Sequence, residues 1–144
     1  MSFRLRAGEQ SLVMGASHAP NDSLVDLIEG LTAMLAGSSS DHITVRWNCE
    51  PEEFDFVFVT EDGNVAFAVT RYPDHRRAPD AGREVFAHSD TKLNVCLPFW
   101  RELRGLQRRA DTDVFAQNWR RPFPQREMQN FTKLIRAAKR QSAL

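Results

Sequence analysis

Apolar residues in the first half of the chain recur with two different periods. One set returns every three or four positions, which is the spacing of one face of a helix: Leu24, Leu27, Ile28, Leu31, Met34 and Leu35. Asp22 or Ser23 precedes this set and can cap a free backbone N–H, and Gly37 follows it. The pattern predicts a helix from Asp22 or Ser23 to about residue 36.

A second pattern, in which apolar and polar residues alternate, predicts strands on both sides of this helix. The stretches with this pattern are 2–7, 11–16, 43–49, 54–59, 65–71, 84–88 and, more clearly than 84–88, 93–97. Gly8-Glu9 and Asp62-Gly63-Asn64 provide turns between neighbouring strands. Consecutive strands joined by short turns predict an antiparallel sheet of about five to six strands.

The C-terminal third has the pattern of helices. Pro98 suits the first position of a helix, and Phe99, Leu103 and Leu106 then share one side. Asp111 or Asp113 can cap a short helix, and Pro124 opens a last helix that runs to about Arg140. We therefore expect residues 1–144 to form a single α+β domain. Its antiparallel sheet would be packed by an N-terminal helix and C-terminal helices in a two-layer sandwich.

Composition narrows the class of protein. The chain has 144 residues, of which 42% are apolar, and this is enough for one packed core. Its apolar stretches are too short for a membrane span, and residues 1–6 lack the apolar block of a signal peptide. The two cysteines, Cys49 and Cys96, lie among apolar residues without CxxC spacing. These features predict a cytoplasmic, bacterial-type protein without structural disulfides and without membrane attachment.

Charge is separated along the chain although the formal net charge is zero. Residues 1–90 contain 7 Lys or Arg and 15 Asp or Glu, whereas residues 91–144 contain 12 and 4. The two parts therefore carry net charges of −8 and +8. Such a dipolar molecule can use one pole to bind a partner.

Two tryptophan motifs carry a resemblance. They are Trp47-Asn48-Cys49-Glu50-Pro51, before the predicted hairpin, and Trp119-Arg120-Arg121-Pro122-Phe123-Pro124, before the last helix. Over roughly residues 22–140 the chain resembles a group of small uncharacterised bacterial proteins with W-x-x-E-P and W-x-x-P-F-P motifs. The resemblance implies a similar fold, and it implies no catalytic residue because the group has no assigned activity.

The sequence contains no recognisable catalytic, metal or cofactor motif. The histidines lack zinc-site spacing, no serine lies in a G-x-S-x-G turn, and the glycines form no phosphate-binding loop. The carboxylates flanking the predicted hairpin are interpreted as a solvated acidic rim: Glu50, Glu52, Glu53, Asp55, Glu61 and Asp62. We expect no catalytic residue, no metal and no cofactor.

The basic C-terminal third supplies the candidate binding residues, which are Arg101, Arg104, Arg108, Arg120, Arg121, Arg136 and Arg140. Three interpretations stay open for them. They form a solvated helix surface partly neutralised by the acidic half, they bind an acidic protein surface, or they bind nucleic acid through phosphates and stacking.

The stretch 72–82 is the longest predicted loop, and long loops on rigid scaffolds often carry function. Its candidate residues are Arg71, Asp74, His75, Arg76 and Arg77. The favoured hypothesis is a non-enzymatic protein-binding module of the immunity or adaptor kind, whose partner is another protein or a second copy of the chain. The alternatives are nucleic-acid binding through the C-terminal helices, and an enzyme whose site is assembled near this loop.

Overall fold

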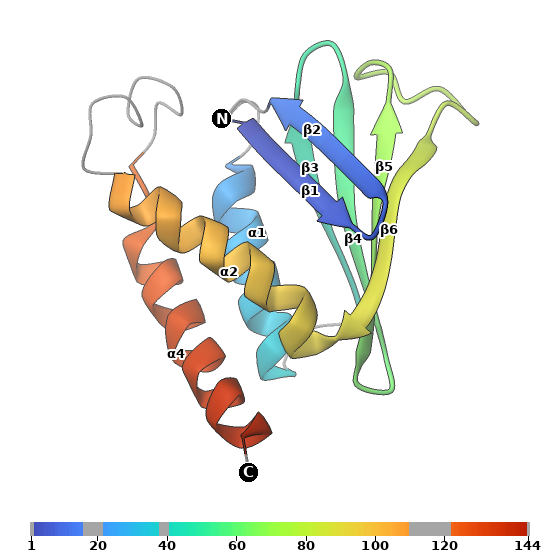
Figure 1. Ribbon diagram of the computed structural model, residues 1–144. Coiled ribbons are helices and arrows are strands. Elements are labelled where there is room, and N and C mark those ends of the chain that lie inside the picture. The colour runs from blue at the N-terminus through green and yellow to red at the C-terminus, as the bar shows by residue number, and fades with distance from the viewer. Residues whose placement is uncertain (1, 16–21, 38–40, 110–121, 144) are drawn as a thin grey trace.

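The computed structural model is built around a four-stranded antiparallel meander in which each strand pairs with the next along the chain (Figure 1). The structure describes residues 2–15, 22–37, 41–109 and 122–143. The four strands are β3 (His42–Asn48), β4 (Glu53–Glu61), β5 (Asn64–Tyr72) and β6 (Arg83–Thr91). The prediction of an antiparallel α+β fold is therefore confirmed.

The first two strands form a separate two-stranded sheet, so the expected single sheet of five to six strands is wrong. They are β1 (Ser2–Ala7) and β2 (Gln10–Gly15), joined at Gly8-Glu9 as predicted. The hairpin meets the edge of the meander through a side chain and not through strand pairing. The Gln10 amide donates to the carbonyl oxygen of Ala87 at 2.7 Å and accepts from the N–H of Ala87 at 2.9 Å. It thus bonds to the edge of β6 much as a neighbouring strand would.

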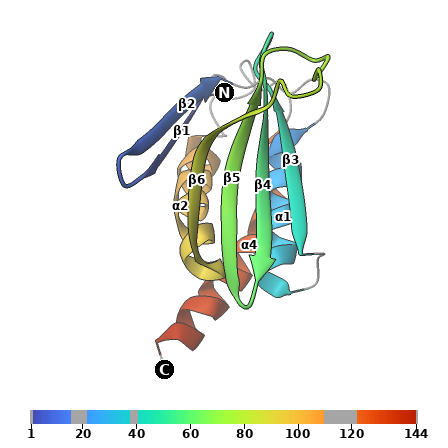
Figure 2. The ribbon, with the colours of Figure 1, turned by 90° about the vertical axis from the view of Figure 1, so that its right-hand side faces the viewer.

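The described helices all lie on one face of the meander, as Figure 2 shows. They are α1 (Ser23–Ala36), α2 (Lys92–Arg109) and α4 (Gln125–Ser142). The predicted ends of α1 are confirmed. The Asp22 side chain accepts from the N–H of Val25, and Gly37 ends the helix with a left-handed φ of 71°. The predicted last helix is also confirmed, whereas the short helix expected after Asp111 or Asp113 lies outside the described residues.

The core lies between the meander and the helices. Alternate strand residues point toward the helices, and the aromatic ones are fully or almost fully buried: Trp47, Phe54, Phe56, Phe58, Phe67 and Phe86. The rings of Phe58 and Phe67 are stacked, with centroids 4.8 Å apart. Phe99 of α2 contacts both of these rings and that of Phe56. These ring contacts stabilise the position of α2 on the sheet.

Helix α2 begins earlier than the sequence pattern predicts. Residues 93–97, expected as a strand, form its first turns, and Pro98 lies inside the helix and not at its first position. The cause is a cap at the end of β6. The Thr91 hydroxyl accepts from the N–H of Asn94 at 3.2 Å, and the Asp90 carboxylate accepts from the Asn94 side chain at 3.0 Å. These bonds begin the helix directly after the strand.

Hydrogen bonds at the start of α2 also change the pKa of the Asp90 carboxyl. The Asn94 side chain and the backbone N–H of Thr91 hold the pKa of the Asp90 carboxyl below its usual range. An ionised carboxylate at this position also interacts favourably with the positive end of α2. The start of α2 therefore depends on side-chain caps, which offset the loss of one backbone bond at Pro98.

We predict that Thr91→Ala lowers the free energy of unfolding by about 1 kcal/mol, because α2 loses the hydroxyl that caps it. Thr91→Ser keeps an oxygen at the same position and should retain most of the stability. Urea unfolding followed by circular dichroism measures both changes. Equal losses for the two variants would contradict the capping role.

Candidate functional site: a cleft between helix α2 and the N-terminal hairpin

A cleft of about 830 Å³ lies between β1 and α2, next to the edge of the meander at β6. This volume is within the range of small-molecule and cofactor sites, about 300–1,000 Å³. One side of the cleft consists of residues 4–7 of β1 with Val13 of β2, and the opposite side consists of α2 residues between Asn94 and Arg109. Figure 1 shows β1 on the side of the hairpin that is nearer to α2.

The floor of the cleft is apolar. Leu27 of α1, Phe67 of β5 and Phe86 of β6 lie at its base, and all three are buried. Helix α2 adds side chains that are only partly buried, among them Phe99 and Leu106. An apolar floor of this kind favours a ligand that brings apolar groups of its own.

The rim of the cleft is basic. Its described residues include four arginines, Arg4, Arg6, Arg101 and Arg109, and a single carboxylate, that of Glu102. Arg4, Arg6 and Arg101 are exposed, and within the part of the chain that the structure describes none of them forms an ion pair. The electrostatic potential at the cleft therefore favours an anionic ligand.

The structure separates the arginines that the sequence analysis groups together. Arg101 lies on the rim of the cleft. Arg104 lies 5.8 Å from the ring centre of Trp100, and Lys139 of α4 lies 5.6 Å from the same ring. The Trp100 N–H in turn donates to the Thr132 hydroxyl at 3.0 Å, which places this group at the contact between α2 and α4.

The remaining predicted arginines are exposed or outside the described residues. Arg108 lies in the last turn of α2, where a cation complements the negative end of the helix dipole. Arg136 and Arg140 are exposed on α4, and Arg120 and Arg121 lie outside the described residues. The ion pairs of Arg71 with Glu52, of Arg77 with Glu53 and Asp55, and of His88 with Asp90 all lie within the acidic half of the chain. These pairs use no cation of the C-terminal helices.

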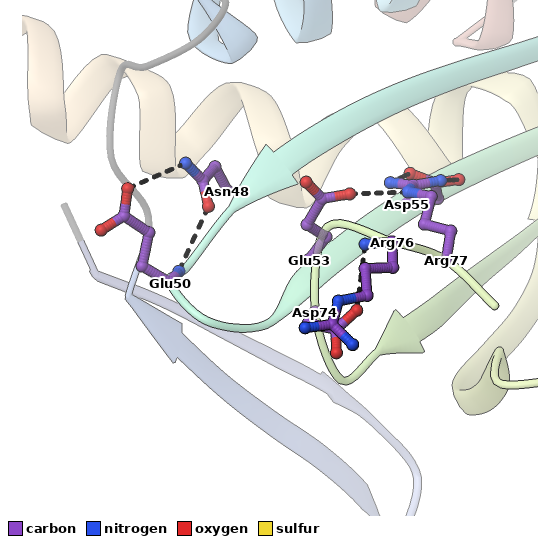
Figure 3. A network of polar contacts seen from close by, with 7 residues as sticks. All are labelled: Asn48, Glu50, Glu53, Asp55, Asp74, Arg76 and Arg77. Atoms are coloured by element: carbon purple, nitrogen blue, oxygen red, sulfur yellow. Dashed lines mark hydrogen bonds and ion pairs between the residues drawn. The ribbon is translucent and has the colours of Figure 1, made fainter.

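Arg77 crosses from the loop after β5 to the outer face of the sheet (Figure 3). Its guanidinium donates to Asp55 through two nitrogens, each at 2.8 Å, and to Glu53 at 2.6 Å. The hydrogen bonds to Asp55 and Glu53 raise the pKa of Arg77 further above its already high value. Arg77 also stacks 4.2 Å from the centre of the Tyr72 ring. We call this group, Arg77 with Glu53 and Asp55, the Arg77 clamp.

The Arg77 clamp corrects the interpretation of the hairpin carboxylates. Glu53 and Asp55 are only 7% and 8% exposed, so they are not part of a solvated rim. Buried carboxylates need a paired cation, and Arg77 supplies it from a distant position in the chain. The exposed members of the predicted rim include Glu50, Glu61 and Asp62.

The other loop candidates do not converge on one point. Arg71 pairs with Glu52, and the Asp74 carboxylate accepts from the backbone N–H of Arg76 at 2.9 Å within the loop. His75 is exposed. The loop residues thus order the loop and pair with the carboxylates of β4 and of the residue before it.

The cysteines are protonated at neutral pH. Burial raises the pKa of Cys96 to about 12, and burial together with the nearby Glu52 carboxylate raises that of Cys49 to about 11. Neither supplies the thiolate that nucleophilic catalysis requires. Within the described ranges, no group of three His, Cys, Asp or Glu side chains is arranged to hold a metal ion.

No family model, curated protein or solved structure matches the chain. The resemblance to small bacterial proteins with two tryptophan motifs is therefore still a prediction. In the first motif, Trp47 is buried, and Asn48 and Glu50 bond to each other at the end of β3 (Figure 3). In the second, Phe123 is buried and the tryptophan lies outside the described residues. No described helix is long and apolar enough to cross a membrane.

Sequence reasoning missed half of the cleft. Arg4 and Arg6 lie in the acidic part of the chain, far from the C-terminal arginines in sequence. Their signal is local: they alternate with Leu5 and Ala7, which gives β1 one basic face and one apolar face. Only the position of the hairpin in the fold brings that basic face near Arg101.

We predict that Arg77→Ala lowers the free energy of unfolding by about 3 kcal/mol, because it leaves two buried carboxylates without a cation. Arg76→Ala removes a neighbouring arginine whose side chain forms no ion pair among the described residues, and it should change stability by less than about 0.5 kcal/mol. Chemical denaturation of the two variants measures the difference. Equal stabilities would show that the clamp contributes nothing.

Proposed function

We propose that this protein is a non-enzymatic module of the immunity or adaptor kind, and that it binds another protein through the cleft between β1 and α2. The observation that carries the proposal is the combination of an apolar floor with three exposed arginines, Arg4, Arg6 and Arg101, that have no ion-pair partner among the described residues. Protein interfaces combine an apolar centre with a polar rim in the same way.

Charge supports a protein partner with an acidic surface. Opposite charges at the rim of an interface speed up association and select against partners of the wrong sign. Arg4, Arg6 and Arg101 lie at such a rim, and they surround apolar side chains that a partner can cover. The affinity should therefore fall as salt increases, while the apolar contacts persist.

Nucleic-acid binding has less support. Proteins that bind single strands stack bases on exposed aromatic rings, and among the described residues the only large hydrophobic side chains that are exposed are Val13 and Val59. The cations are spread over the cleft rim, the contact between α2 and α4, and the helix ends. The sequence pI of about 6.9 is also low for a nucleic-acid-binding domain.

An enzymatic function near the 72–82 loop also has less support. A catalytic site needs titratable groups that converge on a substrate position. In the described structure, charged side chains of this region pair with one another, in the Arg77 clamp and in the pair of Arg71 with Glu52, and do not surround a common substrate position.

The test of this function is affinity capture from the source cells with the wild-type protein and two charge-reversed variants. Arg101→Glu alters the cleft, and Arg126→Glu is a matched reversal at an exposed position of α4 that does not line the cleft. We expect one protein to be captured by the wild type and by Arg126→Glu. The purified partner should bind Arg101→Glu about tenfold more weakly, with the difference shrinking at higher salt.

Equal capture by both variants would place the binding surface elsewhere. Capture of nucleic acid with a steep salt dependence would favour the alternative function. Either result would contradict the proposal that the cleft binds a protein.

A further inference from the structure

The wall of the cleft formed by β1 is the edge of a strand. Four consecutive residues, 4–7, line the cleft. Val13 of β2, opposite Arg4, also lines the cleft from the exposed face of the hairpin. Successive side chains of a strand point to opposite faces, so a wall to which four consecutive residues contribute includes the edge of the strand. The backbone N–H and C=O groups of β1 that point away from β2 therefore face the cleft.

This edge has no hydrogen-bonding partner among the described residues. β1 pairs with β2 alone, and no described group outside the hairpin bonds to the backbone of residues 4–7. The two edges of the meander differ from it. Gln10 bonds to the edge of β6 at Ala87, and the Ser23 hydroxyl donates to the carbonyl oxygen of Arg46 on the edge of β3. An open strand edge is a template for pairing with another strand.

The faces of β1 determine what kind of strand would fit beside it. Leu5 and Ala7 are partly buried and pack against the core, whereas Arg4 and Arg6 are exposed. An added strand would place every second side chain beside Leu5 and Ala7, over the apolar floor. Its other side chains would lie beside Arg4 and Arg6. Apolar residues suit the positions beside the apolar pair. Acidic residues suit the positions beside the two arginines, because opposite charges stabilise cross-strand pairs.

We propose that the cleft binds an extended segment of a partner protein, in which acidic and apolar residues alternate, as a third strand on the free edge of β1. This inference rests on the proposed function and specifies its mode of binding. Backbone hydrogen bonds to β1 supply part of the affinity. The alternating side chains, acidic toward Arg4 and Arg6 and apolar toward Phe67 and Phe86, supply the specificity.

A synthetic peptide of alternating Glu and Val tests this mode with the full-length protein. A second peptide has the same composition, but its valines are three and four positions apart, as on a helix. We expect the alternating peptide to bind at least about tenfold more tightly than the helix-patterned one, because only the first presents both faces and a strand backbone. Arg101→Glu should weaken binding and Arg126→Glu should not.

Backbone methylation gives the sharpest control. In a strand, the N–H groups that point toward one edge all belong to residues whose side chains point to the same face. Methylating only the Glu amides or only the Val amides therefore blocks opposite edges of the peptide. We expect one methylated peptide to lose binding at least about tenfold and the other to keep it. Amide hydrogen exchange should also slow at alternate positions among residues 4–7 when the peptide binds.

The outcomes separate the two proposals. Binding that depends on Arg101 but is equal for the two methylated peptides would overturn strand addition and leave the cleft as the binding site. No binding of any peptide, together with capture from cells that does not depend on Arg101, would overturn the proposed function itself. Sedimentation that shows a dimer of the free protein, with protected β1 amides, would assign the edge to a second copy of the chain and overturn the partner segment.

Discussion

The contact between the N-terminal hairpin and the edge strand β6 determines whether the cleft exists. An isolated two-stranded hairpin is marginally stable in water, so β1 and β2 need contacts with the rest of the protein to keep their place. The Gln10 side chain bonds to both backbone groups of Ala87, and Leu5, Leu12 and Met14 pack against the core. Without these contacts β1 would not face α2, and Arg4 and Arg6 would not approach Arg101.

The charges of the two halves of the chain have different structural roles. In the described structure the acidic half takes its paired cations from itself: Arg71 pairs with Glu52, and Arg77 with Glu53 and Asp55. The basic residues of α2 and α4 lie at helix ends, around Trp100 or on the cleft rim, and Arg101 on that rim forms no ion pair with a described residue. The separation of charge seen in the sequence therefore persists at the surface, where it can attract a partner of opposite charge.

The parts of the fold that follow from local patterns could be predicted from the sequence. The stripe and caps of α1, the alternating strands β3 to β5 and the stripe of α4 each contain their signal within a few residues. The start of α2 was predicted wrongly because residues 93–97 alternate like a strand and Pro98 suits the first turn of a helix. The decisive signals were the caps at Asp90 and Thr91, together with Val95, Phe99 and Leu103 at helical spacing.

Features that join distant residues could not be predicted in this way. The Arg77 clamp joins positions more than twenty residues apart, and the cleft joins β1 to α2 across most of the chain. Arg101 was correctly singled out as an exposed cation, but its neighbours Arg4 and Arg6 depend on where the hairpin packs. The hydrogen bonds that hold the hairpin at β6 come from Gln10, whose pattern in the sequence is that of an ordinary strand residue.

Amide hydrogen exchange at Ala87 tests the position of the hairpin most directly, because the Ala87 N–H on the edge of β6 donates to the Gln10 side chain. We predict that this amide exchanges at least about tenfold more slowly in the wild type than in Gln10→Ala, which corresponds to one hydrogen bond of about 1.4 kcal/mol. Equal and fast exchange of Ala87 in both proteins would show that the hairpin is not held at β6 and that the cleft has no fixed wall.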